Sequence, residues 1–209
     1  LLRHIAGSDP SLDGLEEPIH ERTQGNPFFV EELVRELAEC GHLEGERGDY
    51  RLVRPIGDHG VPVTVQAVLA ARIDRLRPEA KQLLGVASVV GKEISAEALR
   101  LTAGLEQEEI DALLRELVGA GFLYEVELYP RRVLAFRHPL TREVAYGTQL
   151  AESRTATHAA AARAMIELEP ERHDELATLI ASHMEAGEET REAARWSARA
   201  AYWAGHRRP

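Results

Sequence analysis

The spacing of apolar residues along the chain predicts a protein built mainly from helices. Between Phe28 and Cys40, apolar residues recur at every third or fourth position, and glutamate and arginine occupy the positions between them. This spacing puts the apolar side chains on one face of an amphipathic helix. Gly41 follows at the position where glycine often ends a helix. A weaker helical pattern covers Leu12–Glu21, and we expect Pro18 to break it.

Residues 44–60 are polar and rich in glycine. Within them, Tyr50–Val53 predicts a short strand or one arm of a hairpin inside a long loop. Loops of this length are uncommon in compact domains, so a contact with a partner or a hinge is one interpretation of the segment. We expect residues 1–60 to form one small, mainly helical subdomain.

The next part of the chain, residues 61–140, predicts four helices and a β-hairpin. Apolar periodicity and capping residues indicate helices at Val63–Arg77, Pro78–Val90, Ala96–Thr102 and Gln107–Val118. The helix that begins at Pro78 is apolar on nearly every side, as expected of a buried central helix. Two short strands follow at Phe122–Val126 and Val133–Phe136. Three helices followed by a hairpin is the element order of a winged-helix domain.

Residues 141–209 predict alanine-rich helices at Thr141–Leu150, Ser153–Leu168, Glu171–Ala186 and Glu189–His206. In the last of these, small residues alternate with aromatic ones in a pattern that resembles one helix of a tetratricopeptide-like (TPR-like) repeat. The expected fold class is therefore mainly α. It comprises a helical subdomain, a winged-helix domain with a small β-hairpin, and α-helical TPR-like hairpins.

Composition narrows the range of functions. The 209 residues contain 25 basic and 35 acidic side chains, a formal net charge of −10, which argues against extended binding to nucleic acid. The one cysteine, Cys40, excludes an internal disulfide framework and a cysteine-rich zinc site. No apolar run approaches the roughly 20 residues that span a bilayer. We expect a cytoplasmic protein without membrane contact, and the absence of an initial Met suggests a piece of a longer polypeptide.

The sequence shows no self-sufficient active site. Residues 85–93 look like a phosphate-binding P-loop, but five residues separate the two glycines instead of four, and Glu93 stands where the P-loop has Ser or Thr. We therefore expect a buried helix in this segment. The nine histidines include no His-x-x-x-His pair on one helix, so we expect no metal centre. The chain by itself is not expected to be an enzyme.

A winged helix also invites a DNA-binding interpretation, and a winged-helix transcriptional regulator is the alternative function. The helix that would enter the major groove begins with four carboxylates within residues 106–111, and these would be repelled by phosphate. Arg131 and Arg132, in the hairpin, favour DNA contact instead. We expect a winged helix that faces protein and does not contact DNA.

Three segments of the chain resemble, in the same order, the signal-transduction ATPases with numerous domains (the STAND class). Residues 21–33 (ERTQGNPFFVEEL) are similar to the GNPFFVEEL block of that class. Residues 61–76 include VPVTVQ and ARIDRL, and residues 136–146 (FRHPLTREVAY) complete the match. These ATPases are AAA- and NB-ARC-like, and their modules occur in nucleotidyl-cyclase-linked proteins and in LuxR- or maltose-regulator-type transcription factors.

The resemblance implies the C-terminal part of such an ATPase. Residues 1–60 would be a partial helical lid, residues 61–140 a winged helix, and residues 141–209 a linker with the start of a TPR-like array. The P-loop domain, with Walker A and Walker B segments, would lie upstream. The chain would be a non-catalytic regulatory fragment that couples the nucleotide state of that domain to movement of the winged helix and the repeats. Its partners would be the P-loop domain and the downstream repeats, with a further protein partner or an oligomer left open.

The resemblance also implies two nucleotide-binding residues. Pro27 would pack on the adenine, and His138 would approach the β-phosphate of ADP. An imidazole suits the second role because it can donate to phosphate and its charge responds to its surroundings. Each residue has a structural alternative, Pro27 as a helix-start proline and His138 at a strand-to-helix turn. No cofactor is expected in the isolated chain, whereas ATP or ADP with Mg²⁺ would bind to the parent protein.

Overall fold

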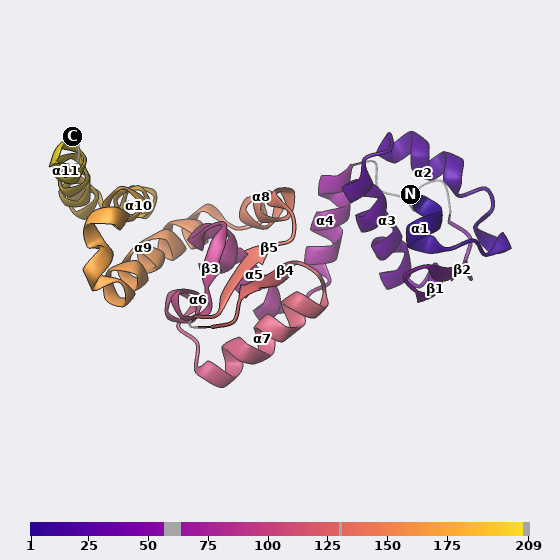
Figure 1. The fold of residues 1–209 in the computed structure, drawn as a ribbon, viewed down its shortest axis with the longest axis horizontal. Helices are drawn as coiled ribbons and strands as arrows, with labels where there is room; N and C mark the ends of the chain where they lie inside the picture. The colour runs from indigo at the N-terminus through magenta and orange to yellow at the C-terminus, as the bar shows by residue number, and fades with distance from the viewer. Residues whose placement is uncertain (57–63, 130, 207–209) are drawn as a thin grey trace. The chain divides into compact units, whose positions relative to one another are not determined.

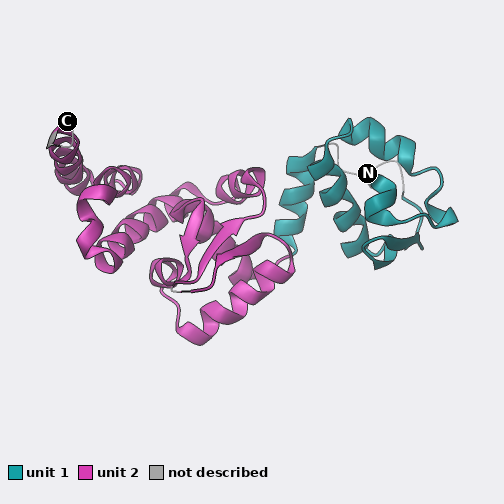
Figure 2. Ribbon diagram, viewed as in Figure 1, with its two compact units in different colours: residues 1–75 teal, residues 76–209 magenta. Residues whose placement is uncertain are grey.

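The computed structural model describes residues 1–56, 64–129 and 131–206. The chain divides into two compact units, Leu1–Arg75 and Leu76–Pro209 (Figure 2). The predicted domain boundary between residues 60 and 61 lies outside the described residues, and the helix that follows it belongs to the first unit. The predicted boundary between residues 140 and 141 lies inside a helix of the second unit. The mainly α fold class is confirmed.

Helices and one small hairpin make up the first unit (Figure 1). They are α1 (Leu2–Ala6), a short 3₁₀ helix (Pro10–Leu12), α2 (Glu16–Thr23), α3 (Pro27–Glu39), β1 (Leu43–Glu46), β2 (Asp49–Leu52) and α4 (Val65–Asp74). The prediction that Pro18 breaks a helix is wrong. Pro18 lies in the first turn of α2, where its missing N–H leaves no helical hydrogen bond unmade.

The predicted strand at residues 50–53 overlaps β2, which pairs with β1 in an antiparallel hairpin. Leu43 stands opposite Leu52 in this pairing. Gly45 has a φ of 123°, and a Cβ added to it would lie 2.2 Å from the Asp49 carbonyl oxygen. Only glycine therefore fits at this position of the hairpin.

The apolar face of α3 forms the core of the first unit. Leu33 and Leu37 are almost fully buried, as are their neighbours on the same face, Phe29, Val30 and Val34. The other buried members of this cluster come from the surrounding elements: Ile5, Ala6, Leu12, Ile19, Leu43 and Val68. The apolar stripe predicted between residues 28 and 40 is thus confirmed as the buried face of a helix.

The second unit combines a three-stranded sheet with the remaining helices (Figure 1). Its elements are α5 (Pro78–Val90), β3 (Glu93–Ser95), α6 (Ala96–Ala103), α7 (Gln107–Gly119), β4 (Leu123–Glu127), β5 (Val133–Phe136), α8 (Pro139–Gly147), α9 (Ala151–Leu168), a 3₁₀ helix (Pro170–Arg172), α10 (His173–Ala186) and α11 (Thr190–His206). The antiparallel sheet has the strand order β3-β5-β4. From α5 to β5, the element order is that of a winged helix.

α5 is the central helix of this unit, and it packs against α6, α7, α8 and α9. Leu83, Leu84 and Ala87 are almost fully buried, and so is the Ser88 side chain, whose hydroxyl donates to the Gly85 carbonyl oxygen at 2.6 Å. Residues 85–90 therefore belong to a buried helix, as predicted, and do not form a phosphate-binding loop.

Among the last three helices, α9 packs against α10, and α10 packs against α11. Ala162, Ile180, Met184 and Ala193 form the buried cluster between them. The turn between α10 and α11 lies very close to α9, since a Cβ added to Gly187 would lie 2.8 Å from the Ala159 backbone nitrogen. None of the helices in the described ranges is both long and apolar enough to cross a membrane.

Candidate functional site

A tight turn between α2 and α3 presents Pro27 to solvent. Gln24 and Gly25 have φ values of 48° and 74°, which direct the chain from one helix into the other. The Asn26 side chain caps α3 by accepting a hydrogen bond from the Phe29 N–H at 3.2 Å. Pro27 takes the first helical position, where its fixed φ favours the helix. The exposed ring of Pro27 is thus held in one orientation.

An open hollow of about 390 Å³ lies beside this turn. Its wall includes Gly25, and the apolar side chains of Ile19 and Val30 together with His20 line it further. Pro27 itself is not part of the wall. Arg3 and Glu16, which form an exposed ion pair, also line the hollow, so its wall is partly charged and partly apolar.

Two of the three motif segments meet at a buried ion pair between α3 and α4. The Arg72 guanidinium donates a hydrogen bond to the Glu32 carboxylate. The two side chains are only 1% and 4% exposed. The Arg72 Nε atom also donates to Glu39 Oε1 at 3.1 Å. A buried charge is tolerated only when it is paired and hydrogen-bonded, so these contacts fix the position of α4 on α3. The pattern of apolar and polar residues along the chain does not indicate this pairing.

A second arginine reinforces the same contact. Arg75 Nη1 donates to Glu36 Oε1 at 3.0 Å, and this pairing raises the pKa of Arg75. Glu36 also accepts a weak hydrogen bond from the Cys40 thiol at 3.4 Å. Partial burial and the nearby Glu36 carboxylate raise the pKa of that thiol, which makes Cys40 a poor nucleophile.

In the second unit, His138 is the N-cap of α8, between β5 and the helix. Its Nδ1 atom accepts a hydrogen bond from the Leu140 N–H at 3.1 Å, and Pro139 takes the first helical position. In the neutral ring the proton therefore lies on Nε2, the atom that would donate to a phosphate. The N-terminus of a helix also favours an anion. The structural role expected at a strand-to-helix turn is present as well, since the ring caps the helix.

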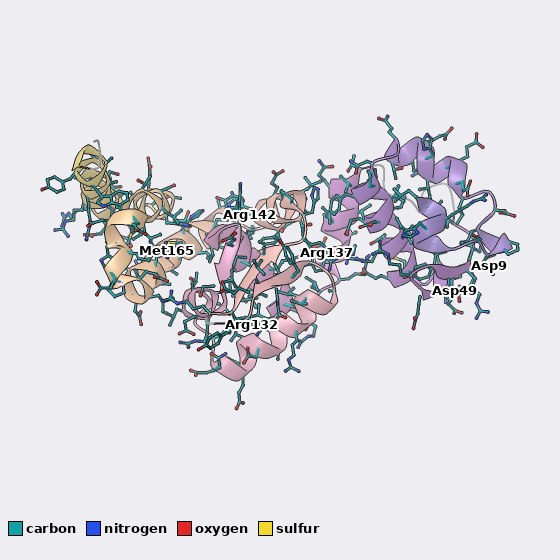
Figure 3. All side chains as sticks on the ribbon, viewed as in Figure 1. Asp9, Asp49, Arg132, Arg137, Arg142 and Met165 are labelled. Carbon is teal, nitrogen blue, oxygen red and sulfur yellow. The ribbon has the colours of Figure 1, made fainter. Side chains whose placement is uncertain are left out.

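Arg142 and Gln149 attach α8 to the central helix. The Arg142 Nε atom donates to the Ser88 carbonyl oxygen at 2.8 Å, near the C-terminal end of α5. The Gln149 amide donates to the Gly85 carbonyl oxygen at 3.2 Å. Figure 3 labels Arg142 on α8 and Arg137 at the end of β5. The third motif segment thus serves to hold α8 on α5.

The hairpin arginines are engaged in ion pairs. Arg132 Nη1 lies 2.9 Å from Asp111 Oδ1, and its Nε lies 3.0 Å from Glu125 Oε1. Arg131 pairs with Glu169 at the end of α9. Arg131, Arg132, Asp111 and Glu169 border a groove of about 410 Å³, and Met165 of α9 also lines it. Figure 3 labels Arg132 and Met165. Three carboxylates therefore compete with any phosphate for the two guanidinium groups.

Pro27 belongs to the first unit and His138 to the second, and the surroundings of each are described within its own unit. Sequence reasoning missed a further group, a hydrogen-bonded chain of Tyr146, His158 and His183. These residues lie 12 and 25 positions apart, and no sequence pattern connects them. Within the described part of the chain, no three His, Cys, Asp or Glu residues gather in a way that could hold a metal ion.

No protein-family model matches the chain, and no curated protein matches it either.

Proposed function

We propose that the chain is a non-catalytic regulatory module of a STAND-type signalling ATPase. In this proposal residues 1–60 act as part of a helical lid, the winged helix follows, and the last helices begin a TPR-like array. The module couples the nucleotide state of an upstream P-loop domain to movement of the winged helix and repeats. The parent protein is an ATPase. In some members of the class, such an ATPase is linked to a nucleotidyl cyclase.

The observation that carries this proposal is the geometry of the two implied contact residues. Each of them stands at the beginning of a helix, and a capping hydrogen bond fixes the local backbone or the ring. Pro27 offers an exposed, rigid apolar ring. His138 places an imidazole at a helix N-terminus, where an anion is favoured. These are the properties that contacts with an adenine and a phosphate require.

The residues of this chain would act as follows when ATP or ADP with Mg²⁺ is bound to the P-loop domain. Pro27 packs on the base, and the capped start of α3 keeps its ring in position. His138 donates from Nε2 to a phosphate oxygen and thereby joins the second unit to the same ligand. The bound nucleotide favours the closed arrangement, in which Pro27 and His138 both contact it, because it binds this arrangement more tightly than the open one. Nucleotide exchange therefore shifts the population towards the open arrangement.

The ion pairs of the α3–α4 contact support this mechanism, since they let the first unit move as one body. Arg72 and Arg75 connect α4 to α3 through Glu32 and Glu36. A displacement at Pro27 would then be transmitted along α3 to α4.

The partners in this scheme are the P-loop domain, the downstream repeats and, as a further proposal, another protein or a second copy. The proposal places the protein in the cytoplasm, without a membrane contact.

The alternative function, DNA binding by the winged helix, has weaker support. The first turn of α7 carries Glu108 and Glu109, and a Glu106–Glu109 capping box holds it. The wing residues Arg131 and Arg132 would have to exchange their carboxylate partners for phosphate. Both features oppose an approach to a duplex. A salt-dependent gel shift with duplex DNA, lost in an Arg131→Ala and Arg132→Ala variant, would favour this alternative.

Calorimetry with ADP and a turnover assay with ATP test the proposed function on the 209-residue chain and on the full-length gene product. We expect the chain alone to bind ADP very weakly and to hydrolyse no ATP, because it lacks the Walker residues. The full-length product should bind ADP tightly. Micromolar ADP affinity or ATP turnover by the chain alone would contradict the proposal.

A further inference from the structure

A chain of hydrogen-bonded rings connects three helices of the second unit. The Tyr146 hydroxyl of α8 lies 3.0 Å from His158 Nε2 of α9, and His158 Nδ1 lies 2.9 Å from His183 Nδ1 of α10. The two imidazole centroids are 5.0 Å apart. His183 is buried and His158 is half-buried. The contact between α9 and α10 therefore includes a direct hydrogen bond between two titratable groups.

The bond between the two Nδ1 atoms restricts the charge of the pair. One nitrogen must donate and the other must accept, so at least one of the two rings is neutral. When both rings are protonated, each Nδ1 carries a hydrogen, and two N–H groups face each other at bonding distance. Full protonation thus turns an attractive contact between α9 and α10 into a repulsive one.

The surroundings oppose even the first added proton. Burial lowers the pKa of His183 to about 4, with smaller contributions from His158 and Arg142. Burial also lowers the pKa of His158, and the charges of Arg142 and Arg154 act in the same direction. The charged groups that act on the pair are thus cations, Arg142 from α8 and Arg154 from α9. Tyr146, which is hydrogen-bonded to His158, is a further titratable neighbour on α8.

The packing around the pair is tight. Ala159, next to His158, contacts Gly187 so closely that a Cβ on Gly187 would lie 2.8 Å from the Ala159 nitrogen. On α10, Ile180 and Met184 are buried on either side of His183 along the helix. His183 is only 5% exposed, so a charge on its ring is poorly hydrated while α10 packs on α9. The hydrogen-bonded pair therefore senses whether these helices are in contact.

We propose that Tyr146, His158 and His183 form an acid-sensitive latch, which holds the α10–α11 hairpin against α9 at neutral pH and weakens that contact in mild acid. The latch does not depend on the nucleotide roles proposed for Pro27 and His138. A free imidazole has a pKa of about 6.5. Below that pH the separated helices take up protons that the packed ones bind poorly, so the contact weakens as the pH falls from about 6.5 towards 4.

Amide hydrogen exchange of the 209-residue chain tests the latch between pH 7 and pH 4.5, with rates corrected for the intrinsic effect of pH. We expect the opening equilibrium of α10 to rise roughly fiftyfold over this range, as linkage to one imidazole predicts. The amides of α3, in the first unit, serve as an internal reference and should show a much smaller change. Nitrogen-15 spectra of the same samples should show His183 still neutral at pH 5.5.

Variants separate the latch from a general effect of acid. His183→Gln keeps a hydrogen-bonding group that does not titrate, so it should flatten the pH dependence at α10. His173→Gln is the matched control on the same helix: it keeps a donor for the Ile166 carbonyl oxygen, which the His173 ring contacts at 2.8 Å, and should behave like the wild type. If His183→Gln does not fold, His158→Gln replaces it as the test variant, and the wild-type spectra show the pH at which His183 is protonated. An unchanged acid response in the folded variant, or a wild-type His183 that titrates near 6.5 while α10 stays protected, would overturn the proposal.

Discussion

Arg72 of α4 and Glu32 of α3 form an ion pair whose side chains are 1% and 4% exposed. Each belongs to a different motif segment, and 40 residues separate them in the chain. Removing two such charges from water is costly, and the cost is recovered only when both partners are present with good hydrogen bonds. The pair therefore makes the docking of α4 specific, because a different placement of α4 on α3 would leave a buried charge without its partner.

Arg72→Met should destabilise the first unit by about 3–5 kcal/mol, since it leaves the buried Glu32 with only its longer pairing to Arg35 at 3.6 Å. The double variant Arg72→Met with Glu32→Leu should recover most of that loss. Arg51→Met is a control, because the Arg51–Glu44 pair is exposed and such pairs contribute roughly 0–1 kcal/mol. Urea unfolding followed by the NMR signals of the first unit measures all three. Equal effects of Arg72→Met and Arg51→Met would contradict this account.

The Asn26 cap and the Pro27 ring can be separated by mutation. Asn26→Ala removes the acceptor for the Phe29 N–H and should cost about 1 kcal/mol, whereas Asn26→Ser should retain most of the stability. Pro27→Ala should change the free energy of unfolding by roughly 1 kcal/mol or less, because the first helical position needs no N–H partner. The same urea titration measures these effects. A large loss on Pro27→Ala would mean that the ring is needed for folding.

The contact between the α10–α11 turn and α9 leaves no room for a methyl group. Gly187→Ala should therefore cost about 1–3 kcal/mol, because its Cβ would lie 2.8 Å from the Ala159 nitrogen. Gly119→Ala, at the end of α7, has no atom within 4 Å of the added Cβ and should be neutral or slightly stabilising. Tryptophan fluorescence follows the unfolding of this part of the chain, because Trp196 packs on the buried cluster of α9, α10 and α11. Indistinguishable midpoints for the two variants would exclude a tight contact.

The helices of this chain could be predicted from the sequence because local rules determine them. α5 begins at Pro78 and ends at Val90 as expected, since a proline starts it and Gly91 follows it. α8 begins two residues before the predicted Thr141, because Pro139 takes the first position and His138 caps it. β3 could not be predicted. It has three residues with one apolar side chain, Ile94, and exists because β5 pairs with it.

The candidate site shows the same division between local and long-range information. Motif positions identified Pro27 and His138, and the turn chemistry around them is local. The partners of Glu32 and His183 are 40 and 25 residues away in the sequence, so their burial and their contacts follow from tertiary packing alone. An alternating or helical pattern cannot indicate which two helices will meet. The nucleotide roles of Pro27 and His138 stay predictions.

The central claim is that Pro27 and His138 contact one nucleotide in the full-length protein. The ADP dissociation constant of the full-length gene product, measured by calorimetry for Pro27→Ala and His138→Ala, tests it most directly. Pro78→Ala and His4→Ala are matched controls, a second proline at a first helical position and an exposed histidine that does not line the hollow beside Pro27. We predict that each test variant weakens ADP binding roughly tenfold, about 1.4 kcal/mol, and that the controls do not. Wild-type affinity in both test variants, or a full-length product that binds no ADP, would contradict the account.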